Sequence, residues 1–293
     1  MATLTVLTWN LFHGRDHPLE GSPEHASVNR VLRDEFAAVL ARERWDIALL
    51  QEAPPLWLGP LAHAAGASGS SALTSRNFGA FVRRRLAEWN PDLIASGEGG
   101  SNQILARAGW RIDETRRLTL TLLPERRRLI WARLTHPEQG DLSAATLHAT
   151  AHDPAAAARD VERAARAACG WSAELPLVFG GDLNLRMAEL PDAFERLRAD
   201  LGLGGARPGR AIDHVLVRGL ATQTPPEPLT PERREVRDPD GRLVRLSDHA
   251  PVVATYEIGS LRQRAEENDG AGEEVDLPEV EHEEVDREEE GGR

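Results

Sequence analysis

The 293-residue sequence contains no lysine, because all 35 of its basic residues are arginine. Mechanisms that need a lysine Schiff base or the lysine of a phosphate-binding loop are therefore excluded. A coding bias towards arginine and alanine accounts for this composition, and selection for bidentate guanidinium–phosphate contacts is the alternative. The sequence has a single cysteine, Cys169, so an intrachain disulfide is excluded as well.

Long apolar runs are also missing. No run approaches the roughly 18 residues that a membrane-spanning helix needs. The N-terminus has no basic segment followed by a long apolar one, so we expect no signal peptide. These absences predict a soluble, cytoplasmic protein without a membrane span, and a monomer is favoured.

Negative charge is concentrated at the end of the chain. The formal net charge is −12, but residues 260–293 hold 14 acidic residues and 4 arginines, which leaves residues 1–259 with a net charge of −2. We therefore expect one folded domain over residues 1–259 and an acidic, disordered tail over residues 260–293. Apolar residues make up 41% of the sequence, which is enough for the core of one large domain.

The spacing of apolar residues predicts a mixed fold of class α+β. Helices are expected over residues 27–44, 77–88 and 154–168, and strands over residues 4–9, 47–50, 103–107, 116–123, 129–135, 142–149, 175–179, 211–217 and 251–258. The regular alternation of a doubly wound parallel sheet is lacking, so two packed sheets flanked by helices are favoured. Residues 225–228, which include three prolines, are expected to be a loop, and loops within residues 54–100 are expected to determine substrate choice.

One polar motif follows the apolar run at residues 175–179. In Phe179-Gly180-Gly181-Asp182-Leu183-Asn184, two glycines are followed by a carboxylate and an amide two residues apart. Side chains at i and i+2 share a face of a strand, so Asp182 and Asn184 are expected to point at one ligand. A carboxylate beside a neutral amide suits the orientation of a nucleophile next to a phosphate.

Similar polar motifs stand next to other predicted strands, most of them at the end of an apolar run, whereas the last two named here open or precede a strand. They are Trp9-Asn10, Gln51-Glu52, Thr146-Leu147-His148, Ile212-Asp213-His214 and Ser247-Asp248-His249. Each motif alone is compatible with a turn, a helix cap or a core hydrogen bond. Their joint occurrence next to strand ends instead indicates one site at the rim of a sheet.

In this order, from Thr8-Trp9-Asn10 to Ser247-Asp248-His249, the motifs resemble the endonuclease/exonuclease/phosphatase superfamily, which includes DNase I and enzymes similar to exonuclease III. The resemblance implies a four-layer αββα sandwich of two mainly antiparallel sheets flanked by helices. It also implies hydrolysis of phosphate esters with a divalent cation, Mg²⁺ or alternatively Mn²⁺, by in-line attack of water on phosphorus.

The resemblance assigns a metal site and a water site. Glu52 is expected to ligate the metal, with Asn10 beside it and Asp248 completing the site, because Mg²⁺ takes one or two carboxylates and keeps several waters. Asp182 is expected to align or deprotonate the attacking water. Asn184 would donate to phosphoryl oxygens or help to hold the nucleophile.

Three further residues are assigned to the phosphate in the same way. His148 matches the phosphate-contacting histidine of the family, and His249 would contact the scissile phosphate as a donor or general acid. Asp213 would accept a hydrogen bond from the other ring nitrogen of His249 and raise the pKa of that ring. His13 could contact substrate or metal, or be structural only, and Asn102 is a weaker candidate.

The expected substrate is a phosphate ester, with nucleic acid as the favoured class. Residues 83–85, 126–128 and 233–234 are arginine clusters that could bind phosphates or be solvated faces. Trp57, Trp89 and Trp110 could stack on bases or belong to the core. Two alternatives stay open: a phosphatase or phosphodiesterase acting on small-molecule or lipid-head-group phosphates, and a non-catalytic binding protein of the same fold.

Overall fold

The computed structural model describes residues 2–18, 27–28, 30–74, 100–123, 125–238 and 240–258. The helix predicted at residues 77–88, the arginine cluster at 83–85, Trp89 and the predicted acidic tail lie outside these residues.

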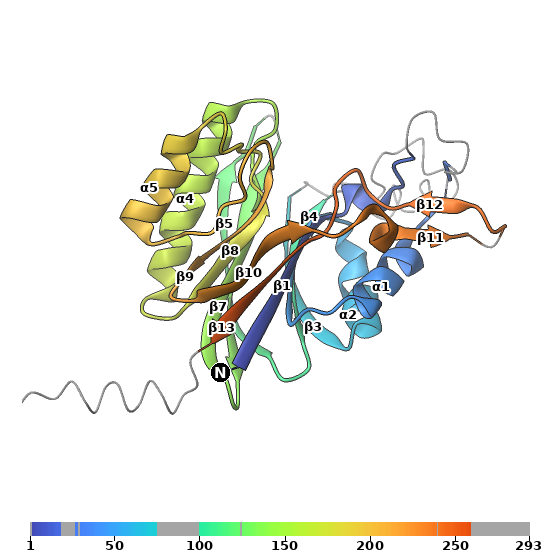
Figure 1. Ribbon diagram of the computed structural model, residues 1–293, viewed down its shortest axis with the longest axis horizontal. Helices are drawn as coiled ribbons and strands as arrows, with labels where there is room; N and C mark the ends of the chain where they lie inside the picture. Colours follow the sequence, from blue (N-terminus) through green and yellow to red (C-terminus); the bar gives the residue numbers. More distant parts are fainter. Residues whose placement is uncertain are drawn as a thin grey trace, which may run out of the picture.

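Two β-sheets pack face to face at the centre of the molecule (Figure 1). The first has the strand order β10-β13-β1-β2-β4-β3, with bounds β1 (Ala2–Asn10), β2 (Ile47–Ala53), β3 (Ala67–Leu73), β4 (Ser101–Arg107), β10 (Ala221–Pro228) and β13 (Val252–Ile258). The second has the order β5-β6-β7-β8-β9, with bounds β5 (Arg111–Thr121), β6 (Arg127–His136), β7 (Gly140–His148), β8 (Leu177–Asp182) and β9 (Asp213–Arg218).

Helices cover the outer face of each sheet. The first sheet is covered by α1 (Arg33–Arg42) and α2 (Leu58–Ala64), and the second by α4 (Pro154–Ser172) and α5 (Pro191–Leu201), as Figure 1 shows. Shorter elements complete the described chain: η1 (Phe12–Gly14), η2 (Pro55–Trp57), η4 (Pro231–Arg234) and the hairpin of β11 (Glu235–Arg237) and β12 (Leu243–Arg245).

Three apolar clusters hold these layers together. Between the sheets, Leu49 of β2 packs in one cluster with Ile130 of β6. The other two clusters join each sheet to its helices, for example through Phe36 of α1 on one side and Phe179 of β8 on the other. The predicted four-layer αββα sandwich of class α+β is therefore confirmed.

Most neighbouring strands in the described chain are antiparallel, and the two exceptions position the site. β1 pairs with β2 in parallel, and β7 pairs with β8 in parallel. Parallel strands deliver their carboxyl ends to the same edge of a sheet. The residues that end β1, β2, β7 and β8 therefore gather at one rim of the sandwich.

Several local predictions need correction. The first helix is shorter than residues 27–44, and residues 54–74, expected to carry loops, form α2 and β3. The proline-rich segment 225–228 is part of β10 and not a loop. β10 is an edge strand, where a proline that lacks an N–H does not interrupt a ladder on its free side. Helix α5 was not predicted at all.

Candidate active site

Strand register brings the predicted motifs together. Asn10 pairs with Gln51 across the parallel β1–β2 pair, and His148 pairs with Asp182 across β7–β8. Asp182 also pairs with Asp213 on the antiparallel strand β9. The amide Nδ2 of Asn10 donates to Oδ2 of Asp182 at 3.0 Å and so joins the rims of the two sheets.

A cleft of ≈ 370 Å³ opens at this rim. Seven of the eight predicted site residues line it: Asn10, Glu52, His148, Asp182, Asn184, Asp248 and His249. The eighth, Asp213, is hydrogen-bonded to His249. The remaining lining residues are Phe12, Glu125, Arg127, Thr150, Ala151, His152 and Ile212.

The two glycines before Asp182 are required by close packing. Gly181 has φ +135°, and a Cβ there would lie 2.2 Å from the carbonyl oxygen of Leu147. A Cβ at Gly180 would lie 2.5 Å from the carbonyl oxygen of His214. Only glycine lets β8 pass this closely between its neighbouring strands and end on Asp182.

Asp182 and Asn184 do not share a strand face as predicted. β8 ends at Asp182, and Asn184 lies beyond it with a left-handed φ of +50°. In this turn the Asn184 N–H donates to Oδ1 of Asp182 at 3.2 Å, and its Nδ2 donates to the carbonyl of Ala149 at 3.2 Å. Both side chains still reach the same cleft, by way of a turn and not through strand periodicity.

The pKa of Asp182 is raised to about 7. Burial is the largest cause, and the negative charge of Asp213 adds to it. The charge of His249 and the hydrogen bonds from Asn10 and from the Asn184 N–H oppose the shift. Asp182 is therefore close to half ionised at neutral pH, which is the range suited to a group that accepts a proton during catalysis.

His249 forms the predicted hydrogen bond with Asp213. Its Nδ1 lies 3.0 and 2.9 Å from the two carboxylate oxygens of Asp213, and its Nε2 lies 3.7 Å from Oδ2 of Asp182. Burial lowers the pKa of the ring, but the hydrogen bond to Asp213 and the charges of Asp213, Asp182 and Asp248 outweigh burial and raise the pKa to about 10. The ring is therefore a cation at neutral pH.

His148 is held neutral between charged groups. Burial and the nearby charge of Arg127 lower the pKa of His148 well below its ordinary value. Its Nδ1 lies 3.1 Å from Nη1 of Arg127, and its Nε2 lies 3.4 Å from Oδ2 of Asp182. Nδ1 also faces Oε1 of Glu52 at 3.2 Å, so at this nitrogen the neutral ring can either accept from Arg127 or donate to Glu52.

Comparison with known proteins agrees with this geometry. The sequence profile of the Endonuclease/Exonuclease/phosphatase family matches residues 7–249. The chain belongs to this family. Its members are hydrolases of phosphate esters, and this is the class of activity that membership supports. Among curated proteins, comparison by sequence finds no match.

Solved structures share the fold of this family member. The human nocturnin catalytic domain with bound sulfate aligns at TM-score 0.59 and 16% identity, covering 88% of this chain and 95% of its own. A mannosyl-6-phosphatase from Bacteroides thetaiotaomicron aligns at TM-score 0.57 and 16% identity, covering 87% and 100%. D. rerio TDP2 complexed with a single-strand DNA product aligns at TM-score 0.56 and 16% identity, covering 88% and 100%.

Two groups of acidic and histidine side chains lie in the site, and the first has the ligand spacing of a cation site. Ligand atoms of Asp182, Asp213 and His249 lie within 4.8 Å of one another. Both carboxylates of that group already accept hydrogen bonds, Asp213 from His249 and Asp182 from Asn10. Glu52 belongs to the second group, where its oxygens face the imidazoles of His148 at 3.2 Å and His13 at 3.1 Å.

Sequence reasoning missed the part that Arg127 plays in the site. Arg127 opens β6, is buried, lines the cleft and contacts Glu125 at 2.6 Å as well as His148. The only signal in the sequence was its place in the arginine cluster at residues 126–128. Gln51 was noted without a role, and its Nε2 donates to Oγ1 of Thr146 at 2.9 Å, a buried link between the sheets.

Other candidates from the sequence prove to be structural. Trp57 and Trp110 are buried in the core. In the cluster at residues 233–234, Arg233 forms an ion pair with Glu43, and buried Arg234 donates to the carbonyl of His249 at 2.6 Å. Asn102 is fully buried, and its Nδ2 donates to the carbonyl of Arg128 at 2.7 Å.

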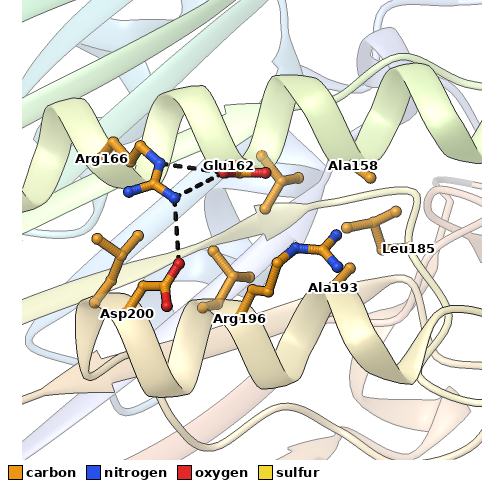
Figure 2. A pocket seen from close by; sticks show the side chains of 10 residues that line it. Ala158, Glu162, Arg166, Leu185, Ala193, Arg196 and Asp200 are labelled. Carbon is orange, nitrogen blue, oxygen red and sulfur yellow. Dashed lines mark hydrogen bonds and ion pairs between the residues drawn. The ribbon is translucent and has the colours of Figure 1, made fainter.

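A second hollow lies between α4 and α5 (Figure 2). Arg166 of α4 pairs with Glu162 of the same helix at 2.8 Å and bridges to Asp200 of α5 at 3.3 Å. The hollow has a volume of ≈ 10 Å³, which is room for about one water molecule. This hollow is a packing gap between helices and not a binding site.

None of the helices in the described ranges has the length and apolar character needed to cross a membrane.

Proposed function

We propose that the chain is a divalent-metal-dependent phosphodiesterase whose favoured substrate is a nucleic acid. The observation that carries this proposal is the pairing of Asp182 and His249 in one cleft. Oδ2 of Asp182 and Nε2 of His249 are 3.7 Å apart, and the pKa values of the two groups are raised to about 7 and about 10. At neutral pH one group can accept a proton while the other donates one.

Asp182 is proposed to accept a proton from the attacking water. Asn10 donates to Oδ2 at 3.0 Å and the Asn184 N–H to Oδ1 at 3.2 Å, so both carboxylate oxygens are fixed in orientation. Oδ2 also faces the imidazoles of His148 and His249, so the second lone pair of Oδ1 remains for the water. A fixed carboxylate contributes through positioning as well as through basicity.

His249 is proposed to donate its Nε2 proton to the leaving oxygen. As water attacks phosphorus and the bond between phosphorus and the leaving oxygen breaks, negative charge develops on that oxygen. The imidazolium supplies the proton, and Asp213 stabilises the cation through Nδ1. Arg127 and His148, which line the cleft and contact each other, are proposed to contact the non-bridging oxygens of the phosphate.

The donor set of the cleft fits a hard divalent cation. Glu52 would hold it, with Asn10 beside it and Asp248 completing the site, since carboxylate and amide oxygens are the ligands that Mg²⁺ and Mn²⁺ take. When bound, the cation would polarise a phosphoryl oxygen and stabilise charge on the phosphate.

Positive charge beside the cleft favours a nucleic acid as substrate. Burial lowers the pKa of Arg128, and the charges of Arg126 and Arg117 lower it further, so these three guanidinium groups lie near one another. Arg127, which stands between Arg126 and Arg128 in the chain, lines the cleft itself. A group of arginines suits a substrate with several phosphates, and D. rerio TDP2, which shares the fold, was solved with a single-strand DNA product.

A small phosphate ester is the second candidate substrate. The ≈ 370 Å³ cleft is within the range of about 300–1,000 Å³ that small-molecule sites occupy. A mannosyl-6-phosphatase is among the proteins of similar fold. A binding protein without catalysis is disfavoured, because Glu52, Asp182, Asn184, Asp248 and His249 are all present at the cleft. We assign the catalytic domain to residues 1–259.

A panel of substrates tests the proposal. The protein is incubated with Mg²⁺ or Mn²⁺ against supercoiled plasmid, single-stranded DNA, RNA, a chromogenic phosphodiester and a phosphomonoester. The proposal is supported if the protein cleaves a polynucleotide, if EDTA stops this cleavage, and if the Asp182→Asn and His249→Gln variants do not cleave. Turnover of the monoester alone supports the second candidate, and equal activity of all three proteins refutes the site assignment.

A further inference from the structure

His13, for which the sequence left a substrate contact, a metal contact and a structural role open, contacts Glu52 directly. Its Nε2 lies 3.1 Å from Oε2 of Glu52, while Nδ1 of His148 lies 3.2 Å from Oε1. Each oxygen of this carboxylate is thus faced by a different imidazole nitrogen. The side chains of His13 and Glu52 are 31% and 18% exposed, so solvent and ions reach the contact.

The backbone around His13 is held in a strained turn. Phe12, His13 and Gly14 all have positive φ, at +47°, +54° and +77°, and Glu52 has φ +48°. Gly14 is fixed against Trp57, since a Cβ at that position would lie 2.2 Å from the indole ring. Non-glycine residues with left-handed φ concentrate at functional sites, where surrounding packing maintains them. Both partners of the His13–Glu52 contact carry this strain.

Packing also fixes which nitrogen of His13 is used. The ring lies against Gly100, where a Cβ would come within 3.2 Å of Cε1 of His13. Within the described chain, Nδ1 is buried and has no hydrogen-bond partner. Nε2 is therefore the nitrogen that the fold presents to a charged group.

Asn10 is a weak candidate for a direct ligand by comparison. Its Nδ2 donates to Asp182 at 3.0 Å, and its Oδ1 accepts the Phe12 N–H at 2.9 Å, so both ends of the amide are engaged. Glu52 thus needs another donor at close range. Nε2 of His13, 3.1 Å from Oε2 of Glu52, can supply that donor.

We propose that Nε2 of His13 is a direct ligand of the cation that Glu52 holds, giving a mixed nitrogen and oxygen site that prefers Mn²⁺ to Mg²⁺. The proposal rests on the metal dependence of the proposed function. Neighbouring ligands of an octahedral ion with bonds of about 2.1–2.2 Å lie about 3.0–3.1 Å apart, which matches the observed contact of 3.1 Å. Imidazole nitrogen suits transition metals, whereas Mg²⁺ prefers oxygen.

Electron spin-echo spectroscopy of bound Mn²⁺ tests this directly, because it detects ¹⁴N nuclei bonded to the ion and needs no turnover. The protein is prepared without a histidine tag, stripped with EDTA and loaded with Mn²⁺. His13→Asn keeps a residue that tolerates left-handed φ but shortens the side chain. His13→Gln is the second variant, and exposed His63 on α2, changed to Gln, is the matched control.

We expect ¹⁴N coupling in the unchanged protein and in His63→Gln, and its loss in both His13 variants. Titration calorimetry should show an about 10- to 100-fold weaker Mn²⁺ affinity in the His13 variants, with a change of less than about threefold for Mg²⁺. Thermal unfolding of the metal-free variants verifies that they fold. Absence of ¹⁴N coupling in the unchanged protein, or coupling that persists in both His13 variants, overturns the proposal.

The outcomes separate this inference from the proposed function. Nitrogen-ligated Mn²⁺ in a protein that hydrolyses no phosphate ester leaves the His13 assignment standing and refutes the function. Metal-dependent hydrolysis with an all-oxygen Mn²⁺ site refutes the His13 assignment alone.

Discussion

Nδ1 of His249 donates to both carboxylate oxygens of Asp213, at 3.0 and 2.9 Å, across 36 residues of sequence. This contact, with the charges of Asp182 and Asp248, is what keeps the imidazole protonated at neutral pH in spite of its burial.

We therefore predict that the pKa of His249 in the metal-free protein, measured by NMR titration of its ring, lies near 10. Asp213→Asn should lower this pKa, because it removes the charge and the acceptor that favour the cation while burial stays. Asp192→Asn on the first turn of α5 changes an acidic residue elsewhere and should leave the titration unchanged. An unshifted His249 in Asp213→Asn would contradict the assignment.

Asp182→Asn should reduce kcat of the best substrate by about 10²- to 10⁴-fold, the usual contribution of a positioned general base. In the unchanged protein, kcat/KM should rise with pH as the carboxylate ionises, since only the ionised form can accept the proton. The midpoint should lie at or below the pKa of about 7 of the metal-free protein, because a bound cation favours the ionised form. In Asp182→Asn this acidic limb should be absent. The measurement is the pH–rate profile at saturating metal, and an identical limb in both proteins would assign it to another group.

Arg127→Gln should weaken phosphate binding. Loss of one charged donor is expected to lower kcat/KM by about 10- to 100-fold, mainly through KM. The same change removes a positive charge next to His148, so the pKa of His148 should rise. Arg111→Gln changes an exposed arginine at the start of β5 and serves as the control. Unaltered KM and unaltered His148 titration together would exclude Arg127 from the site.

Gly181→Ala should destabilise the fold by about 2–5 kcal/mol and abolish activity, because a methyl group would meet the carbonyl of Leu147 at 2.2 Å in a backbone with φ +135°. Gly204→Ala is the matched control, since a Cβ there meets nothing within 4 Å. Urea denaturation of both variants measures the difference. Equal free energies of unfolding of the two variants would show that β8 accommodates the added methyl group without loss of stability.

Arg107→Ala should destabilise the protein by about 2–4 kcal/mol without a direct effect on the chemistry. Its guanidinium stacks on Trp45 at 4.2 Å and donates to carbonyls at the end of α1 and beyond, those of Leu40, Ala41, Glu43, Trp45 and Ala65. Arg111→Ala, with an exposed side chain, should change the free energy of unfolding by less than about 0.5 kcal/mol. Denaturation curves for the two variants measure both changes in the free energy of unfolding.

Much of the site could be predicted from the sequence, because strand ends are visible as apolar runs that stop at a polar residue. Asn10, His148 and Asp182 stand at such ends, and Asp213 opens β9. Register makes neighbours of His148, Asp182 and Asp213, and a side-chain hydrogen bond joins Asn10 to Asp182. The order of the motifs along the chain then indicated the four-layer fold, which the structure confirms.

The features of the site and fold that could not be predicted from the sequence depend on contacts between segments that are distant in the chain. Nothing near Arg127 in the chain shows that its guanidinium faces His148, and nothing near His13 shows that it meets Glu52. The edge position of β10 is likewise a tertiary property, and it makes a strand of a segment whose prolines suggested a loop. Asn184 was predicted to reach the cleft through strand periodicity, but it does so because its backbone has a left-handed φ.

Hydrogen bonds join the end of β1 to the segment that carries Asp248 and His249. Nε1 of Trp9 donates to the carbonyl of His249 at 3.0 Å, and Oγ of Ser247 donates to the carbonyl of Asn10 at 2.7 Å. During synthesis on the ribosome, the first strand emerges long before the segment that carries Asp248 and His249. The cleft is therefore incomplete on every nascent chain that stops short of residue 249.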